Sequence, residues 1–303
     1  VEEETGKYIV VVRQQNDEAV GSLTIKKTGE DLVGAKNVED SLLTKMKNGI
    51  AGTINSISEF FGKEEVIEED SGYMFQYEKK GAEGITFEVY AKETIYTPDG
   101  QKDEAGNRKV LYEKDGLVAK LVTGKEGTVS LHNLPIGSYY LKETDVGNHH
   151  FVLDPEAKEF EIKYQGQEVA VDYVSMELEN KRQKIELVLT KLSKETKEPV
   201  QAAVFGLYAE EDIVDLADNV LIESGTLIAK TESAEDGSIR FDVDLPHGKY
   251  LVKELEAAPG YLKTEDTWSF DATYQNPELE VITLTKEIEN QPTVVEITKT
   301  DIT

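Results

Sequence analysis

The feature that most constrains this chain is an internal repeat. Four segments recur in the same order, and the later ones keep the same spacing to within one residue. The matched pairs are FEVYAKETI (87–95) with FGLYAEEDI (205–213), LVAK (117–120) with LIAK (227–230), LPIGSYYLKE (134–143) with LPHGKYLVKE (245–254), and ELEN (177–180) with EIEN (287–290). Because each copy of a repeat folds as the same unit, the chain is expected to contain one domain twice.

The residues between these markers predict β-structure. Short runs rich in Val, Ile, Leu, Tyr and Thr are interrupted by Gly, Asp, Asn and Pro. This pattern is typical of antiparallel strands joined by turns. Each copy is therefore predicted to be an Ig-like, all-β sandwich of about a hundred residues, and a chain of 303 residues has room for two.

A new strand pattern follows each terminal asparagine. KIELVLTK follows Asn180, VVEITK follows Asn290, and GSLTIKK follows Asn16 at similar spacing. The expected organisation is a C-terminal strand of a preceding unit at 1–16, a first domain at 17–180, a second domain at 181–290, and the first strand of a following unit at 291–303.

The first domain differs from the second by an insertion at about 30–72. Apolar residues recur there at three- and four-residue steps, at Leu43, Met46, Ile50, Ile54, Ile57 and Phe61. That period predicts a helix with one apolar face. We expect this face to pack on its own domain rather than to form a partner-binding groove.

Charge and cysteine content exclude several functions. A net charge of -27 argues against binding to nucleic acid or to an anionic membrane. The chain has no cysteine, so neither disulfides nor cysteine metal sites can reinforce it. No membrane insertion and no signal peptide are predicted, because long apolar runs are missing and Val1 opens an acidic segment. We expect no metal and no cofactor.

Strand alternation directs three polar residues of each domain toward apolar surroundings. Side chains two residues apart share a face of a strand. In the second domain Lys191 shares a face with Leu189, Glu254 with Val252, and Asn290 with Ile288. In the first domain the same parity holds for Lys27, Glu143 and Asn180.

This combination of buried groups suggests a covalent reaction. Burial lowers the pKa of a lysine and raises that of a glutamate, so both can become neutral. A neutral amine is a nucleophile, and a carboxyl group can polarise an amide and pass protons to its leaving group. Attack of lysine on the asparagine side chain would release ammonia and form an isopeptide bond. The fold would supply the proximity that an unactivated amide requires.

These residues resemble a known family. The chain is similar to the Cna B-type repeats of Gram-positive surface adhesins and pilins, which are SpaA-like, prealbumin-like sandwiches. Their Y-x-x-x-E-x-x-A-P-x-G-Y box is visible, with one extra residue before the alanine, as Tyr250, Glu254, Ala258, Pro259, Gly260 and Tyr261. The resemblance implies isopeptide bonds between Lys191 and Asn290 and between Lys27 and Asn180, assisted by Glu254 and Glu143.

The first domain departs from the family pattern after its glutamate. It reads YYLKETDVGNHHF, without the Ala-Pro pair, so the turn that follows Glu143 is undetermined. Its lysine also has a competitor, because Lys79 shares a face with Phe75 and Tyr77. We favour Lys27, which keeps the spacing of the other domain. The adjacent His149 and His150 would face opposite ways on a strand, which argues against a metal site.

The resemblance implies a structural stalk or adhesin module, outside the cell and anchored to the cell wall by a segment beyond this chain. Such a module is not an enzyme, since each domain would react once, upon itself. Its partners would be neighbouring repeat domains. Two alternatives remain: a module that binds a host matrix protein or glycan through the insertion or loops, and a non-catalytic appendage of a secreted enzyme. No YPK-like or LPxTG motif occurs, so polymerisation into a pilus is not supported.

Overall fold

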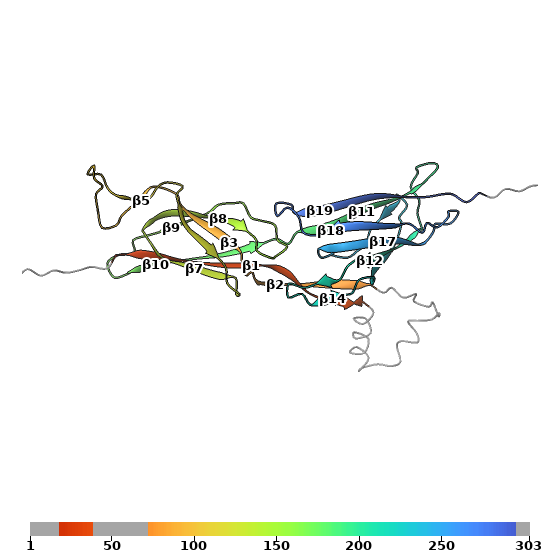
Figure 1. Ribbon diagram of the computed structural model, residues 1–303, viewed down its shortest axis with the longest axis horizontal. Helices are drawn as coiled ribbons and strands as arrows, with labels where there is room; N and C mark the ends of the chain where they lie inside the picture. The colour runs from red at the N-terminus through yellow and green to blue at the C-terminus, as the bar shows by residue number, and fades with distance from the viewer. Residues whose placement is uncertain (1–17, 39–71, 295–303) are drawn as a thin grey trace, which may run out of the picture. The chain divides into compact units, whose positions relative to one another are not determined.

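The computed structural model describes residues 18–38 and 72–294 (Figure 1). Every named element in that part of the chain is a strand, which confirms the predicted all-β class. The helix predicted between Leu43 and Phe61 lies outside the described residues, as do residues 1–16. No helix among the described residues is long and apolar enough to cross a membrane.

The first repeat contributes one set of strands. They are β1 (Val20–Asn37), β2 (Tyr73–Gly81), β3 (Thr86–Ala91), β4 (Ile95–Tyr96), β5 (Val110–Tyr112), β6 (Leu117–Val122), β7 (Thr128–Leu134), β8 (Gly137–Asp145), β9 (Lys158–Ile162) and β10 (Val171–Asn180). One sheet has the order β6-β3-β8-β9, and in the other β10 and β7 both pair with β1. These two sheets form the predicted sandwich.

The second repeat has the same topology. Its strands are β11 (Lys184–Ser193), β12 (Val204–Ala209), β13 (Ile213–Val214), β14 (Val220–Ile222), β15 (Leu227–Glu232), β16 (Ser238–Ile239), β17 (Gly248–Glu256), β18 (Thr267–Ala272) and β19 (Val281–Asn290). The sheet orders are β15-β12-β17-β18 and β16-β11-β19. Each strand of the second repeat therefore has a counterpart in the first, and the repeat seen in the sequence is a repeat of structure.

The start of the predicted insertion is a strand instead. β1 continues to Asn37 and pairs with β2 in an antiparallel hairpin, with Asn37 opposite Tyr73 and a bulge between Leu32 and Gly34. Residues 30–37, at the start of the predicted insertion, are therefore a strand that extends beyond the part of β1 matched by β11. Packing explains the extension, because Leu32, Ala35, Tyr73 and Phe75 cover part of the second repeat's core. Burial of these side chains outweighs the weak strand preference of the Gly and Asp residues nearby.

The described residues group into two compact units. One comprises 18–27, 82–145 and 155–178, and the other comprises 28–38, 72–81, 146–154 and 179–294. The hairpin of β1 and β2 thus belongs with the second core. Residues 146–154, which follow Glu143 in the unusual turn, also belong to that second unit.

Each unit has its own apolar core, built from alternate residues of facing strands. In the first unit the buried residues include Leu23, Ile25, Ile85, Phe87, Val89, Leu121, Leu134, Tyr139, Leu141, Phe160 and Ile162. In the second they include Leu189, Phe205, Leu207, Ile228, Ile239, Leu245, Tyr250, Val252, Phe270 and Ile288. Burial of this apolar surface is the main source of stability in both units.

The repeated Leu-Pro-x-Gly segment closes on a buried tyrosine in each unit. The Tyr139 hydroxyl donates to the carbonyl of Pro135 at 2.7 Å, and the Tyr250 hydroxyl donates to the carbonyl of Pro246. Burial raises the pKa of both hydroxyls, so they stay protonated as hydrogen-bond donors. This contact fixes the start of β8 and of β17, the strands that carry Glu143 and Glu254.

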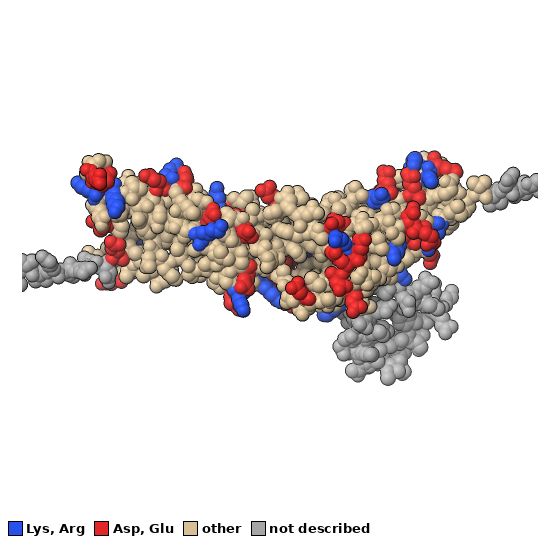
Figure 2. Space-filling view, viewed as in Figure 1, with Lys and Arg blue, Asp and Glu red and all other residues tan. Residues whose placement is uncertain are grey.

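Charged side chains are spread over the surface. On the face shown in Figure 2, acidic and basic side chains lie close to one another, and no continuous basic area is visible on that face. Pairs such as Lys181 with Glu280 are largely exposed, at 76% and 67%. Exposed ion pairs contribute only about 0 to 1 kcal/mol each. The buried charged residues are therefore the exceptional ones.

Candidate functional site

In the second unit, the first and last strands bring Lys191 and Asn290 onto one face. β11 and β19 pair in parallel, with Lys191 opposite Ile288 and Ser193 opposite Asn290. Residues 191 and 193 share a face, so Lys191 and Asn290 are diagonal neighbours on the core side of the sheet. Their residues are 0% and 2% exposed. Water is excluded from both.

Glu254 reaches the same place from the other sheet. It lies on β17 opposite Phe205 of β12, just after a bulge between Val204 and Phe205. The Asn290 side-chain nitrogen Nδ2 donates to both carboxylate oxygens of Glu254, at 2.6 and 2.8 Å. The backbone N–H of Thr264 donates to Oε2 at 2.8 Å. Three hydrogen bonds from two donor groups therefore hold the carboxylate in place, beside the carboxamide nitrogen.

The Lys191 amine stands out by its lack of hydrogen bonds. Its Nζ is buried and has no hydrogen-bond partner among the described residues, and the same is true of Asn290 Oδ1. Burial lowers the pKa of Lys191 below its usual value, although the negative charges of Glu254 and Glu289 act in the opposite direction. A lowered pKa increases the neutral, nucleophilic fraction of the amine.

The first unit buries the equivalent lysine and glutamate in direct contact. Lys27 Nζ lies 2.7 Å from Glu143 Oε2, and the two side chains are 1% and 2% exposed. Glu143 lies opposite Phe87 on β3, again just after a bulge, and the Lys27 amine lies 5.7 Å from the centre of the Phe87 ring. Asn180 is the last residue of β10, a neighbour of β1, and is 3% exposed.

Lys79, the alternative to Lys27, lies elsewhere. Its Nζ contacts Glu179 Oε2 at 2.5 Å, with both side chains about half exposed. It therefore lies in solvent and contacts an exposed glutamate, whereas Lys27 is buried beside Glu143. The geometry favours Lys27 as the lysine of the first unit.

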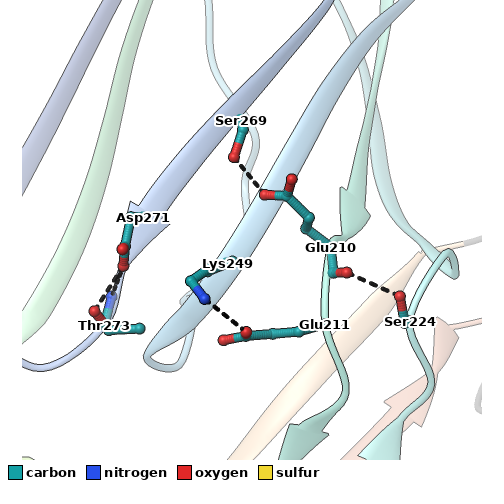
Figure 3. A network of polar contacts seen from close by, with 7 residues as sticks. All are labelled: Glu210, Glu211, Ser224, Lys249, Ser269, Asp271 and Thr273. Atoms are coloured by element: carbon teal, nitrogen blue, oxygen red, sulfur yellow. Dashed lines mark hydrogen bonds and ion pairs between the residues drawn. The ribbon is translucent and has the colours of Figure 1, made fainter.

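An exposed lysine on β17 shows how different the buried site is. Figure 3 shows Lys249 of β17 beside Glu211, at 3.1 Å, with both side chains more than 40% exposed. In the same network Ser269 donates to Glu210, whose carbonyl accepts from Ser224. The contact with Glu211 raises the pKa of Lys249 and keeps it charged. The pKa of Lys191 is shifted in the opposite direction, because its amine is buried away from water.

The turn after each glutamate pairs with the residues that follow the terminal asparagine. In the second unit, Tyr261 forms a bridge with Pro292, next to Asn290. Phe151 forms the corresponding bridge with Arg182, next to Asn180. The first domain has therefore kept this pairing although it lacks the Ala-Pro residues.

The two adjacent histidines of that turn have separate surroundings, and neither could be assigned a contact from sequence. His149 is buried, with Nδ1 2.8 Å from Asp31 Oδ1. The His150 ring lies 4.5 Å from that of His247. Among the described residues no three His, Asp or Glu side chains gather in a group that could hold a metal ion.

Two parts of the site were missed by sequence reasoning. The Thr264 N–H lies on a loop, and a backbone donor leaves no trace in residue type. Phe87 and Phe205 could have been found, because both occupy the first position of the repeated F-x-x-Y-A segment. The two bulges next to them set which residue faces each glutamate, and bulges have weak sequence signals.

Comparisons with known proteins agree with the fold. The family model for the SpaA prealbumin-like fold domain matches residues 76–176 and 185–288. The solved structure of the Bacillus anthracis TIE protein is 22% identical, with a TM-score of 0.50, and the match covers 91% of this chain. The match covers only 34% of the TIE protein chain, so this chain spans about a third of it.

Two pilin structures also match over most of this chain. The shaft pilin SpaA of Lactobacillus rhamnosus GG is 15% identical, with a TM-score of 0.29 and coverage of 92% of this chain and 100% of that one. The major pilin subunit BcpA of Bacillus cereus is 12% identical, with a TM-score of 0.25 and coverage of 90% and 99%. No curated protein matches the sequence.

Proposed function

The chain belongs to the SpaA prealbumin-like fold domain family, and we propose that its two repeats are structural modules of a Gram-positive surface stalk or adhesin, each closed by an isopeptide bond. The proposed domains are 17–180 and 181–290. The contact between Asn290 and Glu254, beside a buried amine without hydrogen bonds, is the observation that carries this proposal.

The proposed reaction in the second unit consumes only the chain's own atoms. Lys191 Nζ, as a neutral amine, attacks Asn290 Cγ, and the C–N bond to Nδ2 breaks. Glu254 takes a proton from Nζ and delivers it to Nδ2, which leaves as ammonia. The hydrogen bonds of Glu254 to Nδ2 suit it for this relay, because it already contacts the atom that must receive the proton. Each site reacts once, so the chain is not an enzyme.

The fold is proposed to accelerate the reaction by holding the reacting groups close together. An amide is a poor electrophile, but fixed reactants reach effective molarities of about 10⁵ to 10⁸ M. β11 and β19 hold the amine and carboxamide on one face, and Thr264 holds the carboxylate. Exclusion of water favours the neutral form of the amine and prevents hydrolysis from competing.

The first unit is proposed to react in the same way through Lys27, Glu143 and Asn180. The buried contact between Lys27 and Glu143 supports these roles. An unreacted, buried ion pair seldom stabilises a fold by itself, because desolvation offsets the attraction. Its presence in a core is easier to explain if it serves the reaction.

A bond between the first and last strands of a unit would carry tension past the strands between them. By analogy with disulfides, closing a loop of about 100 residues in the second unit, or about 150 in the first, would also stabilise each unit by roughly 5 kcal/mol. Such a module suits an extracellular position in a wall-anchored protein, with the anchor outside this chain. Its proposed partners are neighbouring repeat units.

The test is a series of intact masses measured under denaturing conditions. The unaltered chain is expected to be lighter than its sequence mass by two ammonia molecules. Glu254→Ala and Glu143→Ala should each recover one of them, whereas Glu211→Ala, which removes an exposed carboxylate, should recover none. A chain at its full sequence mass, or Glu→Ala variants with unchanged mass loss, would refute the proposal.

A further inference from the structure

The second unit has a partly open strand edge. Hydrogen bonds of a parallel strand alternate between its two neighbours. Lys184 N bonds to the Glu280 carbonyl beside β19, whereas Lys191 N bonds to the Gly237 carbonyl on the opposite side. By this alternation the backbone groups of Ile185 and Leu187 point away from β19. On that side β16 covers only Leu189 and Thr190.

The first unit fills the equivalent edge completely. There β7 pairs antiparallel with β1 from Lys26 back to Gly21, with Val129 opposite Ile25 and Leu131 opposite Leu23. Ile25 and Leu23 correspond to Leu189 and Leu187 when the two lysines are aligned. The missing pairing in the second unit therefore begins at Leu187, and β7 shows what kind of strand fits there.

The segment between Ile239 and Leu245, which follows the start of β16, is one residue longer than its counterpart in the first unit. Ile239 and Leu245 are six positions apart, whereas their counterparts Val129 and Leu134 are five apart. Asp244 stands near the end of this longer segment, and its carboxylate binds Arg182 and Lys184. The Asp244 carbonyl also accepts from the Tyr77 hydroxyl at 3.2 Å. These contacts tie Asp244 to Arg182, to Tyr77 of β2 and to the first residue of β11. Among the described residues the pairing of β16 with β11 ends at Ile239, so residues 240–244 do not extend this ladder.

A groove results between β11 and this loop. Its volume is about 310 Å³, and its apolar lining residues are Ile185, Leu187, Leu189, Ile239, Phe241, Val243 and Leu245. Ile185 and Leu187 are only partly buried, unlike Leu23 and Ile25 in the filled edge of the first unit. The groove thus combines unpaired strand backbone with apolar side chains on one face.

We propose that this groove binds an extended segment of a partner protein, which adds to β11 as an antiparallel strand. Backbone hydrogen bonds to Ile185 and Leu187 would hold the segment, and apolar side chains at every second position would enter the groove. The segment β7 supplies the template, because Leu131 lies opposite Leu23, the counterpart of Leu187, and Leu134 lies opposite Gly21, the counterpart of Ile185. This binding is independent of the proposed crosslinks, since Glu254 and Asn290 do not line the groove.

The probe is a fluorescein-labelled peptide with the sequence of residues 130–135, SLHNLP, which is the part of the first unit's segment that lies opposite the counterparts of the open positions. Fluorescence anisotropy with the whole chain should show saturable binding. A peptide N-methylated at the position of Leu131 loses the backbone donor that would face Leu187, so its affinity should fall about 5-fold, which corresponds to about 1 kcal/mol. A scrambled peptide should not bind.

Deletion of Asp242 provides the matched protein variant. Asp242 is exposed, and its removal restores the five-position spacing, so the chain's own loop is expected to close the edge and block the peptide. A thermal melt checks that the variant is folded. If it does not fold, the N-methylated peptide still decides the case.

Three results would overturn the proposal. One is the absence of saturable binding to the unaltered chain. Another is equal binding of the parent and N-methylated peptides, or binding that persists in the folded deletion variant, because either places the peptide elsewhere. A third is a dimer of the whole chain, measured by light scattering, that disappears on deletion of Asp242, because it assigns the edge to a second copy.

Discussion

Replacing Lys191 by methionine separates a crosslinked core from one that merely buries an amine. Methionine fills a similar volume without a charge and leaves the bonds of Glu254 to Asn290 and Thr264 in place. In a core without the crosslink, removing a buried amine that has no hydrogen-bond partner should be neutral or stabilising, because its desolvation cost disappears. In a crosslinked core the same substitution removes the covalent bond.

The change in stability caused by Lys191→Met therefore has opposite signs with and without the crosslink. The crosslink closes a loop of about 100 residues, which is worth about 4 to 5 kcal/mol by the loop-closure relation. For a unit of about 150 residues, 1 kcal/mol shifts the melting temperature by about 2 to 4 °C, so Lys191→Met should lower the transition of the second unit by about 8 to 20 °C. Differential scanning calorimetry measures this, with the exposed Lys249→Met as the control. An unchanged or raised transition would show that the reasoning is wrong.

Two further predictions concern the turn of residues 146–154 and its neighbours. Burial lowers the pKa of His247 from 6.5 to about 3. Between these two values the unfolded chain binds a proton at His247 that the folded chain does not bind. The free energy of unfolding is therefore highest above pH 6.5 and should fall by about 1.4 kcal/mol per pH unit toward pH 3. Urea unfolding at pH 7, 5 and 4 should show a smaller loss for His247→Asn, and equal losses would contradict this assignment. Gly29→Ala should destabilise the second unit by about 1 to 3 kcal/mol, because the added Cβ would lie 2.3 Å from Cζ of the buried Phe151. Phe151→Leu in the same chain should recover part of the loss, and a stability equal to the parent's would count against the close packing.

The repeat allowed the fold to be predicted from sequence. Two copies of the same strand pattern gave the all-β class, the two sandwiches and the equivalence of Glu143 with Glu254. Strand parity also directed the lysines, glutamates and asparagines inward, and all six are buried in the structure. Parity works here because one face of each strand is packed against a core.

What sequence did not reveal depends on contacts between distant segments. The hairpin at residues 30–37 forms because its side chains meet the core of the second unit, and no local pattern contains that information. The contact between Asn290 and Glu254 depends on a bulge and on a loop amide. The open edge of β11 follows from where the pairing with β16 ends, and no local residue pattern marks that end.

Peptide mapping of the denatured chain tests the central claim most directly. After tryptic digestion, tandem mass spectrometry should find the peptide containing Lys191 covalently joined to the peptide containing Asn290, with the mass of one ammonia missing and no cleavage after Lys191. Finding both peptides separate, with a free amine on Lys191 and an intact carboxamide on Asn290, would contradict the account.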